Sequence, residues 1–198
     1  IAKLGITSLV LTEGANPTHL EFNSDGDLYF SGSSTDGGYN VYRILRESLT
    51  GDSPTPEALF EAGFSLNSPP GLGFDSTQNL YLAVPSQTST PDDTAGRIYK
   101  ITFDENDAPS PPIRIAGTGA PCEADSPCGD GSSALLGQFQ NPQDLDVDES
   151  GILYIADRST LRTLTPTEDA TSYTLATIAG NRLNTAPSTV GDGGPPQN

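Results

Sequence analysis

Residues 141–157 read NPQDLDVDESGILYIAD, and this stretch predicts a β-hairpin. Leu145 and Val147 alternate with polar residues, as in a strand with one buried face. Residues 149–151 contain the Ser-Gly pair of a tight turn, and residues 153–156 form a short apolar run that reads as the second strand. A single hairpin of this kind is common, so it indicates a particular fold only if it recurs along the chain.

Two earlier stretches repeat the hairpin. Residues 17–31 read PTHLEFNSDGDLYFS, and residues 69–83 read PPGLGFDSTQNLYLA. In both, a proline, an aliphatic residue, Phe or Val, Asn or Asp, and a Leu-Tyr pair have the same offsets as in residues 142–157. Such self-similarity is the signature of a repeat architecture.

Further β-rich segments follow each hairpin. Third strands are expected at 39–44, 96–103 and 161–164, and fourth strands at 58–61, 112–117 and 173–180. Residues 48–56, rich in Gly, Ser, Asp and Pro, are expected to form a loop, and residues 104–107 an acidic turn. Four short strands per unit, separated by turn residues, are typical of a propeller blade. The predicted fold class is therefore all-β, a β-propeller of four-stranded antiparallel blades.

The charge balance excludes some partners. The chain has 198 residues, with 26 acidic against 9 basic side chains and a net charge of −17. A basic surface able to neutralise phosphates is absent from this composition, so no nucleic-acid partner is expected. No apolar run reaches the length that spans a bilayer, so no membrane insertion is expected either. The acidic surface keeps the protein soluble, or it binds a cation or a basic partner.

The two cysteines lie close together in the sequence as Cys122 and Cys128. Two thiols are too few for a zinc site without nearby histidines, and the single histidine, His19, is distant in sequence. A local disulfide that closes a loop is the expected state, with two free thiols as the alternative. A disulfide indicates an extracellular, cell-surface or periplasmic location.

The repeats resemble the NHL family, whose six-bladed β-propellers carry a P-x-x-I/L-x-V-D-x-x-G-x-L/I-Y-V-A-D core. Residues 142–157 match this core almost throughout. The first repeat departs at Ser31 and Gly32, and the second has Gln78 at the turn glycine and ends in Val84. Residues 115–119 followed by 129–131, and 178–181 followed by 191–195, are similar to the I-A-G-x-G … G-D-G-G-P linkers of bacterial NHL proteins.

The resemblance implies a domain plan of one propeller segment over residues 1–198. Residues 6–12 stand where a closing, outermost strand belongs. The remaining units are blades at 16–67, 68–140 and 141–180, and an inter-blade linker at 181–198. Three blades cannot close a ring, so we expect a partial or half propeller, completed by a protein partner or by a second copy of the chain.

Catalytic motifs are not found in the sequence. There is one histidine, no G-x-S-x-G nucleophile elbow, and no glycine-rich phosphate loop before a helix. No catalytic residues, metal ligands or cofactor are therefore assigned, although Ca²⁺ stays open as a ligand. The repeat register makes His19, Gly71 and Asp144 equivalent, and likewise Glu21, Gly73 and Asp146. The four polar residues of these sets are candidate binding residues at the channel mouth, or else ordinary solvated residues at strand starts.

Other recurring residues have structural interpretations. Tyr29, Tyr81 and Tyr154 recur at one position and are expected to pack between blades. Asp157 and Arg158 are expected to form structural ion pairs at a blade end. The turn residues that are expected to hydrogen-bond their own turns are Asn23, Asp75 and Asp148.

The sequence thus predicts a non-enzymatic, extracytoplasmic NHL-like propeller. Its expected role is a protein-binding or assembly module, for instance as a subunit or decoration of a cell-surface structure. The alternative is part of a metal-dependent propeller hydrolase or lyase with its site in the central channel, because related gluconolactonase and amidating-lyase types hold a metal there.

Overall fold

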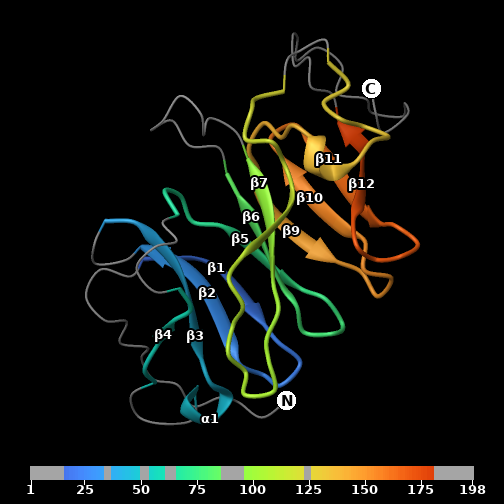
Figure 1. Ribbon diagram of the computed structural model, residues 1–198. Helices are drawn as coiled ribbons and strands as arrows, with labels where there is room; N and C mark the ends of the chain where they lie inside the picture. The colour runs from blue at the N-terminus through green and yellow to red at the C-terminus, as the bar shows by residue number, and fades with distance from the viewer. Residues whose placement is uncertain are drawn as a thin grey trace, which may run out of the picture.

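Three four-stranded antiparallel sheets make up the described part of the protein (Figure 1). The computed structural model describes residues 16–33, 37–49, 54–60, 66–85, 96–122 and 126–180. The expected closing strand at 6–12 and the linker at 181–198 lie outside these residues. Within them, no helix is long and apolar enough to cross a membrane.

Each sheet is a simple up-and-down meander, in which consecutive strands pair with each other. The first contains β1 (Pro17–Phe22), β2 (Leu28–Ser33), β3 (Tyr39–Ile44) and β4 (Glu57–Ala58). The second contains β5 (Gly71–Phe74), β6 (Leu80–Val84), β7 (Arg97–Ile101) and β8 (Ile113–Ala116). The third contains β9 (Pro142–Val147), β10 (Leu153–Asp157), β11 (Thr160–Pro166) and β12 (Tyr173–Gly180). The predicted all-β propeller class is confirmed.

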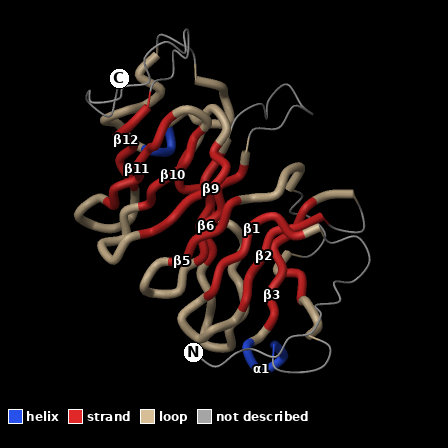
Figure 2. Tube along the Cα trace, turned by 180° about the vertical axis from the view of Figure 1, so that it is seen from behind, coloured by secondary structure: helices blue, strands red, loops and turns tan. Residues whose placement is uncertain are grey.

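The sheets are stacked face to face as blades, with the first strand of each at the centre. β5 packs against both β1 and β9, so these three strands lie side by side (Figure 2). We call the face of a blade that is turned toward the preceding blade its leading face, and the opposite face its trailing face. Because side chains alternate along a strand, each strand contributes to both faces.

Two hydrophobic clusters fill the seams between the blades. In the first seam, Tyr29 on the trailing face of blade 1 packs with Leu72 and Leu82 of blade 2. The Tyr29 ring meets Phe74 edge-on, with the ring centroids 4.8 Å apart. In the second seam, Tyr81 packs with the blade 3 cluster that includes Leu145. Fully burying one such side chain contributes about 1.5–3 kcal/mol, so these seams hold the array together.

The turn residues behave as predicted. The Asn23 side chain accepts a hydrogen bond from the backbone N–H of residue 27, at 2.8 Å. Asp75 and Asp148 likewise accept backbone N–H groups two and four residues further on. Gln78 has φ of 66° where the other repeats have glycine, a conformation that costs a non-glycine residue about 1–2 kcal/mol. Its side chain accepts the N–H of Ser24 in the neighbouring blade, at 2.9 Å.

The end of the first blade differs from expectation. The expected loop at 48–56 begins inside a short helix, α1 (Arg46–Leu49), and the fourth strand is only Glu57–Ala58. The Asp27 carboxylate accepts the N–H of Arg46 at 2.7 Å and so satisfies the start of the helix. Leu49 is buried against the leading face of blade 1. This tertiary contact explains why a segment of turn-forming composition begins in a helix.

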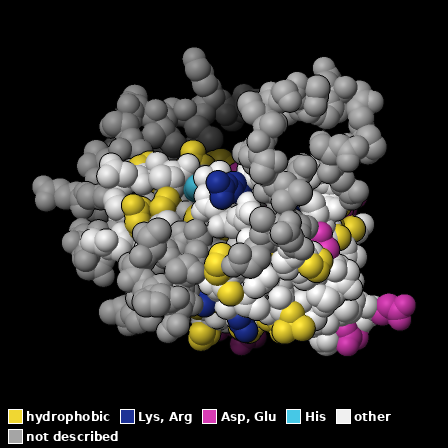
Figure 3. Space-filling view, turned by 90° about the horizontal axis from the view of Figure 1, so that it is seen from above, with side chains coloured by type: hydrophobic (Ala, Val, Ile, Leu, Met, Phe, Trp, Pro, Cys, Tyr) yellow, Lys and Arg dark blue, Asp and Glu magenta, His cyan; other side chains and the backbone are white. Residues whose placement is uncertain are grey.

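The three recurring tyrosines differ in how deeply they are buried. Tyr29 and Tyr81 are buried, at 1% and 2% exposure, but Tyr154 is only partly buried and donates to Asp148 at 3.2 Å. The trailing face of blade 3, which carries Tyr154, packs against no further blade among the described residues. Hydrophobic side chains also reach the surface in the view from above (Figure 3).

A glycine on β5 sets how closely blades 2 and 3 approach. A Cβ atom on Gly71 would lie 2.5 Å from the backbone Cα of Asp144, whereas one on Gly73 would first meet a side-chain atom, Leu145 Cδ1, at 2.6 Å. We predict that Gly71→Ala lowers the free energy of unfolding by about 1–3 kcal/mol, because backbone must move. Gly73→Ala, the matched control, should cost less because a side chain can rotate away. Urea unfolding of the variants measures this, and equal losses would contradict it.

Candidate functional site

The four candidate binding residues surround one depression at the centre of the blade array. His19 and Glu21 lie on β1, and Asp144 and Asp146 lie on β9. Between them the floor is formed by β5, which contributes Leu72. The depression has a volume of about 560 Å³. Residues more than a hundred positions apart in sequence are therefore brought together at the innermost strands.

The depression exists because β5 carries glycines where β1 and β9 carry polar side chains. Gly71 and Gly73 occupy the register positions of His19 and Glu21, and both are buried. Because these two positions carry no side chain, β9 packs directly on the β5 backbone there. The glycine pair is a feature that the sequence reasoning passed over, although its register position was known.

The hydrogen bonds of the site orient its side chains locally. His19 Nδ1 and Ser31 Oγ are 3.2 Å apart, and Ser31 Oγ also lies 2.9 Å from Thr18 Oγ1. Asp144 and Asp146 each accept the backbone N–H of the following residue, at 3.0 and 2.8 Å. Both aspartates are exposed, so the remaining acceptor capacity of their carboxylates faces solvent.

The electrostatics of the depression are negative. Partial burial raises the pKa of Glu21 from its ordinary value, and the charges of Asp146 and Asp144 raise it further, against a backbone hydrogen bond at Phe22 that lowers it. Three carboxyl groups around one hollow favour a cationic ligand over an anionic one. Within the described ranges, however, no three or more His, Cys, Asp and Glu side chains are grouped so as to hold a metal ion.

The raised pKa of Glu21 predicts a pH-dependent stability. The folded state binds the Glu21 proton more tightly than the unfolded state, so the contribution of Glu21 to the free energy of unfolding falls as the pH rises above the ordinary pKa of 4.5. Glu21→Gln removes this penalty and should be more stable than the wild type at pH 7, with the advantage lost below about pH 4. Thermal unfolding across this range measures it. Glu149→Gln, in an exposed turn, is the control, and a Glu21→Gln protein that tracks it at every pH would refute the prediction.

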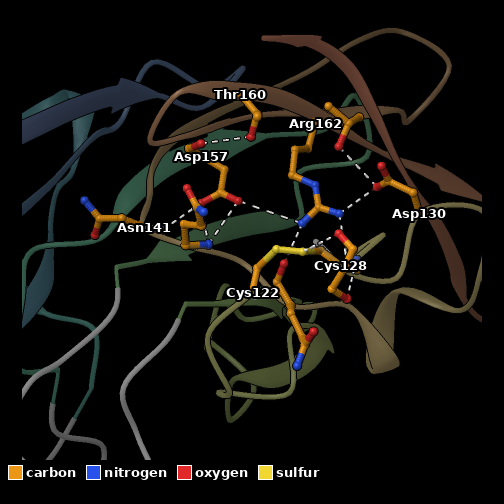
Figure 4. Close-up of a disulfide and its surroundings, with 11 residues drawn as sticks. Cys122, Cys128, Asp130, Asn141, Asp157, Thr160 and Arg162 are labelled. Carbon is orange, nitrogen blue, oxygen red and sulfur yellow. Dashed lines mark hydrogen bonds and ion pairs between the residues drawn. A yellow bond between two sulfur atoms is a disulfide. The ribbon is translucent and has the colours of Figure 1, made fainter. Parts of the chain in front are cut away.

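A second polar cluster stands at the seam of blades 2 and 3, around the buried guanidinium of Arg162 (Figure 4). Arg162 donates to the carbonyl oxygens of Gln138 and Cys128, at 2.6 and 3.2 Å. It also pairs with Asp130 at 2.7 Å and with Asp157 at 3.8 Å. The inter-blade segment that contains residues 128–138 is thereby held against β11.

This cluster contains Asp157 and the two cysteines, for which the sequence predicts an ion pair and a disulfide. Asp157 forms a buried ion pair with Arg162, and it also accepts the N–H groups of residues 140 and 141. The predicted disulfide is present between Cys122 and Cys128. Arg158 lies in the turn after β10 with φ of 53°. Arg162 was missed by sequence reasoning, because the carbonyl oxygens to which it donates belong to a segment 24 to 34 residues earlier.

The stacked four-stranded sheets and their repeated hairpins define an NHL-type β-propeller. The sequence profile of the Teneurin NHL domain matches residues 72–189, more than half of the chain, and the chain belongs to this family. A comparison with curated proteins finds no significant match.

Solved structures support the same fold. A gluconolactonase from Xanthomonas campestris is 18% identical, with a TM-score of 0.50 over 83% of this chain and 47% of its own. A second structure, assigned as a putative gluconolactonase, is 17% identical, with a TM-score of 0.50 over 84% and 50%. At these identities the likeness concerns the fold alone. The chain spans about half the length of these structures.

Proposed function

We propose that this chain is a non-enzymatic, extracytoplasmic propeller module that binds another protein through the two outer faces of its blade array. In this role it acts as a subunit or decoration of a cell-surface structure. The observation that carries the proposal is a contrast in burial: Leu20, Ala156 and Leu161 are exposed at the two ends, whereas their repeat equivalents in the inner seams are buried.

The first outer face is the trailing face of blade 3, which we call the trailing flank (Tyr154, Ala156 and Leu161). The pairing of β10 with β11 places these side chains on one face. Ala156 is exposed and Leu161 is 37% exposed. The equivalent Ala83 and Ile98 of blade 2 are both 0% exposed.

The second outer face is the leading face of blade 1, which we call the leading flank (Leu20 and Phe22). Both side chains lie opposite Phe30 and Leu28 of β2, on the face turned away from blade 2. Leu20 is 63% exposed, whereas its repeat equivalents Leu72 and Leu145 are 3% and 6% exposed. Phe22 is 54% exposed. Apolar sheet faces of this kind favour association with a partner.

The location in the proposal rests on two features. The chain carries a disulfide, which persists in oxidising compartments, and an NHL domain of the Teneurin type. Both are compatible with an extracellular location. The strongly acidic composition fits a basic or neutral protein surface as the partner, since two acidic surfaces repel each other.

Photo-crosslinking tests the binding role. A photo-reactive residue at position 161 or 20 should give adducts of defined mass with a protein partner in cells that express the chain. The same residue at position 136 should give none, because Leu136, although 68% exposed, belongs to the 3-10 helix Ala134–Leu136 and to neither flank. Equal adducts from all three positions, or none from the flanks, would overturn the proposal.

A metal-dependent hydrolase or lyase is the second candidate function. The central depression with its carboxylates, on a fold shared with gluconolactonases, favours it. In this case Glu21, Asp144 and Asp146 would supply oxygen ligands, which suit a hard cation such as Ca²⁺. Among the described residues, however, no three His, Cys, Asp or Glu side chains lie close enough together to hold a metal ion, which counts against a preformed metal site.

Metal titration separates the two candidates. For the binding module we expect no change in melting temperature at millimolar Ca²⁺ or Zn²⁺. For the enzyme, the melting temperature should rise with metal concentration, because a ligand that binds only the folded state stabilises it. Such a rise must vanish in Asp144→Asn and Asp146→Asn if it arises in the depression. Glu149→Gln should leave it unchanged.

A further inference from the structure

We infer that the disulfide between Cys122 and Cys128 is a redox latch on the outer edge of blade 3. In the closed state it holds residues 129–133, which we call the edge strap, along the outermost strand β12. Reduction of the disulfide by a dithiol releases the edge strap and opens the edge of β12. The latch acts on the edge of the sheet and not on either flank, so it goes beyond the proposed function and does not depend on it.

The edge strap is paired with β12 through backbone hydrogen bonds. The N–H of Leu175 donates to the carbonyl oxygen of Ser132 at 3.1 Å, and the carbonyl oxygen of Leu175 accepts the N–H of Gly131 at 2.8 Å. Ser133 forms an antiparallel bridge with Thr174. An outermost strand otherwise presents unpaired N–H and C=O groups, which pair readily with another strand. The edge strap therefore covers the part of β12 where a further strand would add.

The edge strap is tied to the disulfide through the carbonyl group of Cys128. Within the strap, the Asp130 carboxylate pairs with Arg162 at 2.7 Å and accepts the hydroxyl of Thr177 at 3.2 Å. The same guanidinium donates to the carbonyl oxygen of Cys128 at 3.2 Å, and Figure 4 shows it directed toward this residue. The N–H of Gln138 donates to that oxygen as well, at 3.0 Å. Moving the Cys128 carbonyl therefore disturbs the contacts that hold the strap.

The backbone of Cys128 favours such a movement. Its φ is 54°, and it is the only residue of 128–133 with positive φ that is not a glycine. This region is disfavoured for a non-glycine residue by about 5- to 30-fold. The closed disulfide keeps the Cα atoms of the two cysteines 5.3 Å apart and helps to hold Cys128 in this conformation. When the bond is broken, Cys128 can return to negative φ, which turns its carbonyl away from Arg162 and draws the strap off β12.

Opening the latch is a two-electron reduction. Cys122 is 9% exposed and Cys128 is 0% exposed, so the thiolate of a dithiol attacks Cys122 Sγ. A mixed disulfide forms there while the bond to Cys128 breaks, and Cys128 leaves as a thiolate that takes a proton from water. The second thiol of the reductant attacks the mixed disulfide, frees Cys122 and closes the reductant into its own disulfide. In the extracytoplasmic location proposed above, the closed state prevails until such a dithiol is present.

Hydrogen exchange of the full chain, followed by NMR, tests the latch. The amide of Leu175 is the direct reporter, because it donates to the edge strap. With dithiothreitol, its exchange rate should rise by at least about tenfold, since a disulfide that closes a short loop restrains the open state by at least this factor. Reoxidation should restore the slow exchange. The amides of β2 in blade 1 are the internal control and should exchange at one rate in both states.

Two variants without the disulfide test the role of the Cys128 backbone. A Cys122→Ser, Cys128→Ser chain should show fast exchange at Leu175 without any reductant. A Cys122→Ser, Cys128→Gly chain is the matched variant, because glycine adopts positive φ at little cost. Its Leu175 amide should exchange more slowly than in the double-serine chain, by about fivefold or more. Dithiothreitol should change neither variant, since both lack cysteine.

Three results would overturn the inference. The first is an unchanged exchange rate of Leu175 on reduction, which would mean that the strap stays in place without the disulfide. The second is an equal rise in exchange across β2 and β12, which would make the disulfide a general stabiliser of the fold. The third is equal exchange at Leu175 in the two variants. None of these results bears on cross-linking at the flanks, so the proposed function is tested separately.

Discussion

The face-to-face packing of the blades is the interaction on which the rest of the structure depends. A four-stranded sheet with apolar side chains on both faces cannot be stable alone in water, because both faces must be covered. Tyr29 and Tyr81 are buried only because the next blade covers them. The same requirement applies to the two outer faces, to which the proposed function assigns a protein partner.

The centre of the array follows from the same packing. β1, β5 and β9 lie side by side because each begins a blade, and the glycines of β5 let β9 approach its backbone. The carboxylates of Glu21, Asp144 and Asp146 then face one hollow. The depression is thus a consequence of blade stacking around residues that carry no side chain, and its carboxylates make it negatively charged.

The segment between blades 2 and 3 is held by a different kind of contact. Arg162 is fully buried and is paired with Asp130 and Asp157, while its guanidinium also donates to backbone carbonyls of the segment that precedes blade 3. Removing one partner of such a pair leaves a buried charge without compensation, which typically costs about 3–5 kcal/mol. The disulfide between Cys122 and Cys128 closes the same segment. The segment between blades 2 and 3 is therefore anchored by covalent, ionic and hydrogen bonds together.

Much of the fold was predictable from the sequence, because a strand repeats every two residues and a repeat protein reuses one pattern. The hairpin of residues 141–157, its two copies, the turn residues and the local disulfide were all recognisable from short-range order. The contacts of Arg162, the short helix at 46–49 and the incomplete burial of Tyr154 were not. Each depends on what packs against a residue from a distant part of the chain. The sequence by itself determined the blades and their register, whereas only the tertiary structure decided which of their faces are covered, because burial is a property of neighbours and not of pattern.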